Sequence, residues 1–314
     1  MSERIQAFRF DEAVPRIRKG ATVRGKGVNG SESVKVEALM YPVDAGIPGL
    51  NIRFSCDTVK DGYFSPRHRH NFDQVRYVLS GTINIGKGVT LAAGECAYFP
   101  EGTYYGPQEQ KGDGEVFVMQ FPGPQAAYFL LQSDFKAAME KLLASGGVFE
   151  DGAYRRVGAD GQRYNQDGFE AVWEAHNGQP VTYAPPRYAQ PVVIKPDAFD
   201  WVPDERRPGL AVKQLGTFNE YRTSIAEWRL DPGAVAPSER LSAPEFRYVL
   251  KGAVNYAGKT LAPRSCLYVA EGVDTEPLES PEGAELLVIS VPMYVPSVWN
   301  RARQAAAEKL SARH

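Results

Sequence analysis

Residues 62–85 read GYFSPRHRHNFDQVRYVLSGTINI, and they recur as GAVAPSERLSAPEFRYVLKGAVNY at residues 233–256. Both copies contain the run Arg-Tyr-Val-Leu, followed two positions later by glycine. The match resumes further on, where LAAGECAYFPEGTYYGP at 91–107 corresponds to LAPRSCLYVAEGVDTEP at 261–277. Such an order, kept over so many positions, indicates that the chain contains an internal duplication.

Each copy has the composition of short strands broken by Gly and Pro turns. In the first copy the segments VRYVLSG, TINIG, ECAYFP and EVFVMQF are rich in β-branched and aromatic residues. Closely spaced strands of this kind favour a sandwich or a barrel, in which a double sheet protects its edges. We therefore predict an all-β chain with minor helices, in which two tandem sandwiches or barrels are joined by a partly helical linker.

Changes in composition predict five segments along the chain. These are an N-terminal arm at 1–44, a first barrel at 45–125, a helical and extended linker at 126–214, a second barrel at 215–296 and a C-terminal helix at 297–314. Helical patterns lie at 125–147, where the pattern ends in glycines that suit a helix C-terminus, and at 166–179.

The bulk composition excludes several classes of protein. The 314 residues are 43% hydrophobic and 24% charged, which is typical of a globular chain long enough for two domains. With a net charge of -2 the chain lacks the excess of basic residues that is typical of nucleic-acid-binding proteins. No apolar run reaches the length of a membrane span, and the N-terminal residues carry charges where a secretory signal needs its apolar core. We expect a cytoplasmic protein without nucleic-acid or membrane partners.

The first copy resembles the cupin superfamily at the two short motifs that define the family. Four positions match the scaffold of the first motif: Gly62, His68, His70 and Gly81. Three match that of the second: Gly94, Pro100 and Gly102. Gln74 stands where the family usually has Glu, and Tyr105 stands where a His is expected.

The resemblance implies two tandem double-stranded β-helix (jelly-roll) barrels, each with a pocket inside. Family members include metal-dependent dioxygenases, decarboxylases, isomerases and lyases, and also proteins without catalysis, so the fold alone does not choose a reaction. Cupins commonly form dimers through barrel edges, and edge strands need cover, so we expect a homodimer.

The His68 and His70 pair is the candidate metal site. Side chains alternate along a strand, so a His-x-His pair places both imidazoles on one face. Neutral imidazole is a good ligand for transition metals, and we predict a divalent ion such as Fe, Mn, Ni or Zn. The alternative is a pair of solvated or hydrogen-bonded histidines. Gln74 is either a third ligand through its carbonyl oxygen, a group directed at the substrate, or a member of a polar network.

Three further residues are candidates for contact with a substrate. Tyr105 is a candidate ligand, proton donor or base, or an aromatic residue at the pocket mouth beside Tyr104, which we also assign to substrate binding. Arg76 follows Gln74 by two positions and so points to the same face. A substrate carboxylate would pair with this guanidinium, but an internal acid such as Asp73 would serve as well.

The second copy lacks the histidines. Glu239 and Leu241 occupy the positions of His68 and His70, and Thr275 that of Tyr105. Glu245 alone keeps a residue type that serves as a ligand in the family, and one carboxylate does not make a transition-metal site. An internal pair of Glu245 with Arg247 would explain the repeated arginine without any ligand.

The leading hypothesis is a metal-dependent enzyme that acts on a small anionic organic molecule in the first barrel, as an oxygenase, a lyase or an isomerase. The alternative is a non-catalytic protein that binds a metabolite or serves as a scaffold. Gln74 contributes no charge where the family has a carboxylate, and this neutrality is the reason for expecting an anionic ligand.

Overall fold

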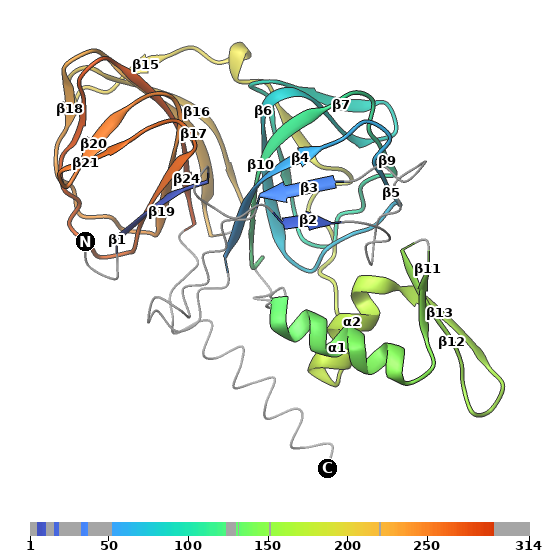
Figure 1. The fold of residues 1–314 in the computed structure, drawn as a ribbon. Helices are drawn as coiled ribbons and strands as arrows, with labels where there is room; N and C mark the ends of the chain where they lie inside the picture. Colours follow the sequence, from blue (N-terminus) through green and yellow to red (C-terminus); the bar gives the residue numbers. More distant parts are fainter. Residues whose placement is uncertain are drawn as a thin grey trace. The chain divides into compact units, whose positions relative to one another are not determined.

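The computed structural model describes residues 5–10, 16–18, 33–36, 52–123, 130, 132–150, 152–219 and 221–291. It separates into two compact units, each built around one copy of the repeat (Figure 1). One unit contains residues 14–37 and 54–193, and the other contains residues 1–13, 38–53 and 194–314. The predicted C-terminal helix at 297–314 lies outside the described residues.

The first barrel is organised around one long central strand. Its main sheet has the order β14 (Val192–Ile194), β8 (Cys96–Phe99), β6 (Asp73–Gly86), β10 (Gly114–Phe121), β4 (Arg53–Val59), β3 (Ser33–Val36) and β2 (Arg16–Arg18). β7 (Val89–Ala92) pairs with the far end of β6, and β5 (Phe64–Ser65) pairs with β9 (Gln108–Glu109). The strands predicted at 75–81 and 82–86 are thus one strand, β6, which bends at Gly81.

Alternation along these strands separates the barrel interior from its exterior. Alternate residues of β6 and β10, with residues of β7 and β8, line an apolar interior that comprises Val78, Ile83, Ile85, Leu91, Ala97, Phe99, Tyr105, Val116 and Val118. Gln74 and Arg76 precede Val78 on β6 by even steps, and Gln120 follows Val118 on β10 in the same way. These three polar side chains therefore belong to the inward face.

The second barrel repeats this plan. Its main sheet has the order β1 (Ile5–Arg9), β22 (Ser265–Val269), β19 (Glu245–Gly252), β24 (Ala284–Ser290), β17 (Thr223–Leu230), β16 (Leu210–Phe218) and β15 (Val202–Pro203). A smaller sheet has the order β18 (Ala234–Ala236), β23 (Leu278–Ser280), β20 (Val254–Tyr256) and β21 (Lys259–Leu261). The two repeats thus form antiparallel barrels, as the sequence predicted.

Segments assigned to the arm and the linker take part in both barrels. β2, β3 and β14 belong to the main sheet of the first barrel, and two further segments belong to the second. β1, from the predicted arm, pairs antiparallel with β22, with Ile5 opposite Val269. In Figure 1 it lies in blue among the orange strands of the second barrel. β15 and the start of β16 lie before residue 215, so the second barrel begins earlier than its predicted boundary. Short strands with few alternating positions explain why these two were missed.

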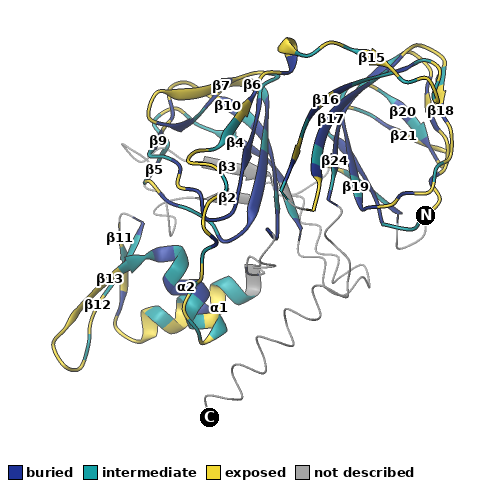
Figure 2. Cartoon of the chain, turned by 180° about the vertical axis from the view of Figure 1, so that it is seen from behind, coloured by how far each residue is buried: buried dark blue, intermediate teal, exposed yellow. Residues whose placement is uncertain are grey.

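The rest of the predicted linker forms a small module in the same unit as the first barrel. It comprises α1 (Gln132–Ala144), β11 (Val148–Glu150), β12 (Ala153–Val157), β13 (Arg163–Asp167) and α2 (Gly168–Asn177); a 3₁₀ turn, η2 (Pro196–Ala198), follows in the other unit. Asp167 caps α2 by accepting from the backbone N–H groups of Phe169 and Glu170. Both predicted helices are present, whereas the three-stranded meander was not predicted. Figure 2 shows the outer part of its β12–β13 hairpin as exposed.

No helix in the described ranges is long and apolar enough to cross a membrane.

Equivalent glycines fix the bend of the central strand in both barrels. Gly81 has φ +65° and Gly252 has φ +67°, and a Cβ at either position would lie 2.3 or 2.1 Å from a backbone carbonyl oxygen. Gly81→Ala is expected to lower the free energy of unfolding by roughly 2–4 kcal/mol, from left-handed strain and the clash together. Gly94→Ala is the control, since Gly94 also has a positive φ but no described atom lies within 4 Å of the added methyl. Equal losses in urea unfolding would contradict the steric part of this prediction.

Candidate functional site in the first barrel

A short backbone bridge brings the His-x-His segment beside the second motif. The N–H of His68 donates to the carbonyl of Tyr105 at 3.0 Å, and the N–H of Tyr105 donates back to His68 at 2.9 Å. This closely paired arrangement places the two side chains next to each other on one face. The two motifs, separate in the sequence, thus meet at His68 and Tyr105.

The Tyr105 hydroxyl is the junction of the site. Its oxygen lies 2.9 Å from Nε2 of His68, 2.7 Å from Nε2 of His70 and 3.2 Å from Nη2 of Arg76. His68 and Tyr105 are buried, while His70 and Arg76 are partly exposed. Four of the six residues singled out from the sequence therefore meet at the Tyr105 hydroxyl.

Hydrogen bonding fixes the tautomer of His68. Its Nδ1 lies 2.7 Å from the carbonyl oxygen of Pro66, which can only accept, so Nδ1 carries the proton. The lone pair of Nε2 then faces Tyr105, whose hydroxyl donates to it. The Tyr105 oxygen in turn accepts from Arg76 and from His70.

Aromatic rings hold His70 in place. Phe72 stacks on the imidazole at a centroid distance of 4.4 Å and an interplanar angle of 24°. Phe169, from α2 of the helical module, approaches the same imidazole edge-on at 5.9 Å. Sequence reasoning did not single out Phe169, because nothing in its local pattern connects the module to the site.

Gln74 faces Arg76. A guanidinium only donates, so the Gln74 amide oxygen must face it, and it accepts from Nε of Arg76 at 2.9 Å and from Nη2 at 3.1 Å. The other end of the Gln74 amide lies 2.8 Å from the amide of Gln120. Gln120 was not predicted, although it lies opposite Gln74 in the β6–β10 register and shares the face of Val116 and Val118.

The guanidinium of Arg76 lies against two aromatic rings. It is 4.6 Å from the ring centroid of Phe99 and 5.2 Å from that of Tyr105. Tyr63 is a further neighbour: burial raises the pKa of Tyr63 above its ordinary value, and the positive charge of Arg76 opposes this shift. Tyr63 and Phe99 are thus additional residues of the site.

Tyr104 and Asp73 lie outside the Tyr105 junction, and the assignment of Tyr104 to substrate binding stays a prediction. Tyr104 is 39% exposed and lies under the guanidinium groups of Arg67 and Arg69, away from the Tyr105 junction. Asp73, offered as an internal partner of Arg76, points to the opposite face of β6. Its carboxylate accepts from the Tyr98 hydroxyl at 2.6 Å and from the backbone of Glu101 at 2.8 Å.

The donor set at the junction suits a divalent transition metal. Two imidazole Nε2 atoms lie within 2.9 Å of one phenol oxygen, and the Pro66 carbonyl holds the proton of His68 on Nδ1, so that its Nε2 carries the lone pair. Within the described ranges no three His, Cys, Asp or Glu residues gather, so a metal here would depend on Tyr105.

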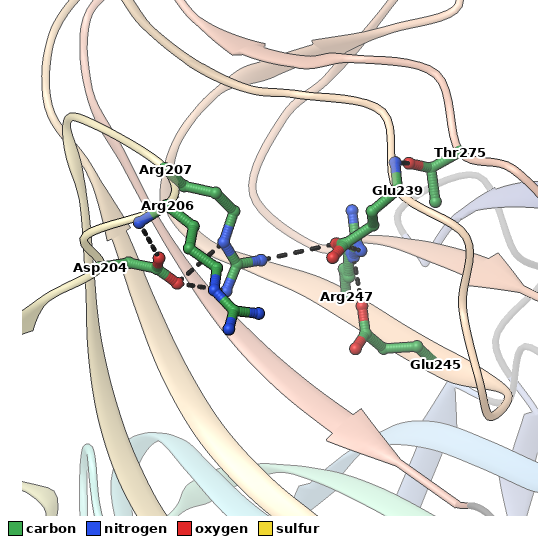
Figure 3. A network of polar contacts seen from close by, with 7 residues as sticks. All are labelled: Asp204, Arg206, Arg207, Glu239, Glu245, Arg247 and Thr275. Carbon is green, nitrogen blue, oxygen red and sulfur yellow. Dashed lines mark hydrogen bonds and ion pairs between the residues drawn. The ribbon is translucent and has the colours of Figure 1, made fainter.

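The equivalent position of the second barrel carries a complete ion network (Figure 3). Nε of Arg247 donates to Glu245 at 2.5 Å and Nη2 donates to Glu239 at 2.9 Å. Burial alone would lower the pKa of the Arg247 guanidinium, but the two carboxylates raise it above its ordinary value. The pair of Glu245 with Arg247 expected from the sequence is confirmed.

A second arginine extends this network. Arg207 donates from Nη2 to Asp204 at 2.7 Å, and its Nη1 lies 3.5 Å from Glu239. The guanidinium groups of Arg207 and Arg247 lie 4.5 and 4.7 Å from the ring centroid of Trp228. The charges of Arg207 and Arg247 are thus paired with carboxylates of the second barrel itself.

The same nitrogen atoms of Arg76 and Arg247 make the corresponding contacts in the two barrels. Nε meets Gln74 in the first barrel and Glu245 in the second; Nη2 meets Tyr105 in the first and Glu239 in the second. Both carboxylates of the second barrel are replaced by neutral groups in the first. Among the described residues, no acid forms an ion pair with Arg76.

Solved structures with the same pair of barrels cover nearly the whole chain. A proposed dioxygenase from Nostoc punctiforme superposes with a TM-score of 0.61 at 11% identity, over 94% of this chain and 85% of that chain. The fold is that of a bicupin. Oxalate decarboxylase from Bacillus subtilis matches this chain with a TM-score of 0.51 at 14% identity, over 91% of this chain and 75% of that chain.

A proposed glyoxylate-induced protein from Pseudomonas aeruginosa matches with a TM-score of 0.56 at 11% identity, over 94% and 91% of the two chains. At such identities the likeness concerns the fold. No protein-family profile and no curated protein sequence matches the chain. The chemistry of this bicupin therefore has to be argued from its own residues.

Proposed function

We propose that the first barrel binds a small organic anion on Arg76 and acts on it as a metal-dependent enzyme, with the metal on His68, His70 and Tyr105. The observation that carries the proposal is the comparison of the two arginines. In the second barrel two carboxylates neutralise Arg247, whereas Gln74 and Tyr105 only orient Arg76. Arg76 therefore keeps a positive charge that an anionic ligand would neutralise.

Electrostatics favours such a ligand. A guanidinium that is partly withdrawn from water loses solvation, and a carboxylate restores the lost interactions through charge-assisted hydrogen bonds. Arg76 is partly exposed, so a ligand can reach it. A divalent ion on the histidines would add positive charge a few ångströms away and strengthen the preference for an anion.

Each residue of the cluster has a separate role in this proposal. A bound metal ion would supply a Lewis acid. The hydroxyl of Tyr105 can give or take a proton, and it is hydrogen-bonded to His68 and His70. Gln74, held by Gln120, keeps the guanidinium of Arg76 in one orientation without neutralising it.

The reaction class is an oxygenase, a lyase or an isomerase. Two of the similar structures are described as a dioxygenase and as an oxalate decarboxylase, and oxalate is a small dicarboxylate. These names support a small anionic substrate. Association into dimers stays a prediction, which light scattering at working concentration checks.

Metal content is the first test. Wild-type protein loaded with Fe²⁺, Mn²⁺, Ni²⁺ or Zn²⁺ and then desalted is expected to retain about one ion per chain, and His68→Ala/His70→Ala is expected to retain less than about a tenth of that. The double variant should stay folded, because the apolar interior does not depend on the ion. His176→Ala, on the exposed side of α2, is the control. Metal retained by the double variant at the wild-type level would refute the assignment.

A non-catalytic bicupin that binds a metabolite is the second candidate. It is favoured by the absence, within the described residues, of three His, Cys, Asp or Glu side chains around one point. A thermal-shift screen of small acids and matched uncharged amides bears on both candidates, because both place an anion on Arg76. If only uncharged compounds stabilise the protein, neither candidate function can include an anion bound to Arg76.

A further inference from the structure

The meander formed by β11, β12 and β13 has an open edge. β13 is the last strand in the order β11–β12–β13, no described strand pairs with its outer side, and Arg163, Tyr164 and Asn165 are exposed (Figure 2). A free strand edge is a template for another strand, and proteins usually block one with proline, a bulge or charge. β13 pairs with β12 without a bulge and contains no proline, whereas β15, at the edge of the main sheet of the second barrel, ends in Pro203.

The alternation of hydrogen bonds shows which backbone groups face this edge. The N–H of Gly168 donates to the carbonyl of Gly152 at 2.8 Å, directly after the last pair of β12 with β13. Because residues that exchange hydrogen bonds alternate along an antiparallel pair, the even-numbered residues of β13 bond to β12. The N–H and C=O groups of Arg163 and Asn165 therefore point away from β12, toward the open edge.

The side chains of β13 complement those of the same strand in a second copy. On β12, Val157 lies opposite Arg163 and Ala153 lies opposite Asp167, so neither charge faces an opposite charge across the β12–β13 pair. A two-fold axis at Asn165 would place Asn165 opposite itself and Arg163 opposite Asp167 of the other copy. Opposite charges directly across an antiparallel pair are stabilising.

We propose that the partner for this edge is a second copy of the chain. Two chains pair antiparallel through β13 around a two-fold axis at Asn165, and their three-stranded meanders become one continuous sheet. This places the expected dimer contact on the meander instead of on a barrel edge, and it rests on the dimer predicted above, not on the metal or the anion. Strands this short bury little side-chain surface, so we expect a Kd of roughly 1–100 µM.

Substitutions in β13 test the contact, with sedimentation velocity over a concentration series as the measurement. Asn165→Pro removes the outward N–H, which the pairing with β12 does not use, and proline is tolerated where the N–H of an edge strand faces solvent. It is expected to raise the Kd at least about tenfold, as is Arg163→Glu, which sets like charges opposite each other. Asn165→Thr keeps the N–H and is expected to dimerise as the wild type does.

Cysteine cross-linking tests the register. Two Asn165→Cys chains would place their Cα atoms about 5.5 Å apart, within the range of a disulfide. Gln162→Cys is the control, because it lies on the same exposed hairpin but its two copies would be roughly 20 Å apart. The three native cysteines are buried and give no background. We expect a covalent dimer from oxidised Asn165→Cys and a monomer from Gln162→Cys on non-reducing gels.

The outcomes separate the interface from the dimer. A wild-type dimer that Arg163→Glu leaves intact and that Asn165→Cys does not cross-link would overturn the β13 contact and keep the predicted dimer. A wild-type chain that stays monomeric over the whole series would overturn both. Equal cross-linking of the two cysteine variants would overturn the axis at Asn165. These results do not depend on whether Asn165→Pro folds, which circular dichroism checks.

Discussion

Replacement of Arg247 by methionine is expected to lower the free energy of unfolding by about 3–5 kcal/mol, the range found when one partner of a buried ion pair is removed. Arg247 is 1% exposed, and its loss leaves the carboxylates of Glu245 and Glu239 without the cation between them. Most of the loss should come from Glu245, whose side chain is 14% exposed, because Glu239 at 37% is partly solvated and keeps Arg207 nearby. Guanidinium chloride unfolding of the purified protein measures the change.

Arg76→Met is the matched control for this experiment. Arg76 is aligned with Arg247 but has no acidic partner among the described residues, so its removal strands no carboxylate. We expect a loss of about 1–3 kcal/mol, smaller than that of Arg247→Met, because the buried Gln74 oxygen loses its donor but no charge is stranded. The triple change Glu239→Gln, Glu245→Gln and Arg247→Met should recover much of the stability lost in Arg247→Met, since it leaves no unpaired charge. Equal losses in the two single variants would show that the networks do not differ as described.

The dependence on pH follows from the direction of the Arg247 shift. The two carboxylates hold the pKa of the folded guanidinium above its ordinary value. A basic group whose pKa is higher in the folded than in the unfolded protein stabilises the fold in full at any pH below its unfolded pKa. This stabilisation is lost only as the pH rises through the pKa of the folded protein. The cost of Arg247→Met should therefore persist unchanged from neutral pH to mildly alkaline pH.

The architecture was predictable because the repeat carries its own evidence. Period-two alternation in VRYVLSG and EVFVMQF specifies which residues face inward, and the second copy repeats the pattern. The pairing of Glu245 with Arg247 followed in the same way, since residues two apart on a strand share a face. β1 and the β11–β13 meander were not predicted, because strands of three to five residues leave too few alternating positions for a periodic signal.

The site was predictable as a set of residues and less so as a set of contacts. The His-x-His spacing placed His68 and His70 on one face, and both meet Tyr105. Of the three roles open for Gln74, the structure shows the polar network: its amide faces Arg76, because a guanidinium and an amide two residues apart satisfy each other directly. Gln120 comes from another strand, and only the β6–β10 register brings it to Gln74. Alternation gives the face of a residue, whereas its partner depends on strand pairing.

The second large effect is expected in ligand binding. Arg76→Met should weaken the binding of a small carboxylate by at least about thirtyfold, because truncation of one member of a charge-assisted pair costs about 2–5 kcal/mol. Calorimetry with α-hydroxybutyrate measures this, after circular dichroism has shown that the variant is folded. Arg67→Met is the control for general electrostatics. Arg67 is exposed and lies 4.1 Å from the Tyr104 ring centroid, so its removal takes away one positive charge without touching the Arg76 contacts.

Gln74→Glu tests the same charge from the opposite direction, since it gives the first barrel the acid that the second barrel has. The new carboxylate would face Nε of Arg76 as Glu245 faces Nε of Arg247, and the guanidinium would be neutralised from within. We expect carboxylate binding to fall about tenfold and the stability of the protein to be kept or raised, a combination that a merely damaged fold would not produce. An uncharged amide of the same acid should bind Gln74→Glu and wild-type protein equally. If Gln74→Glu binds the carboxylate as tightly as the wild type does, the charge of Arg76 is not what the ligand meets, and the anion must lie elsewhere in the barrel.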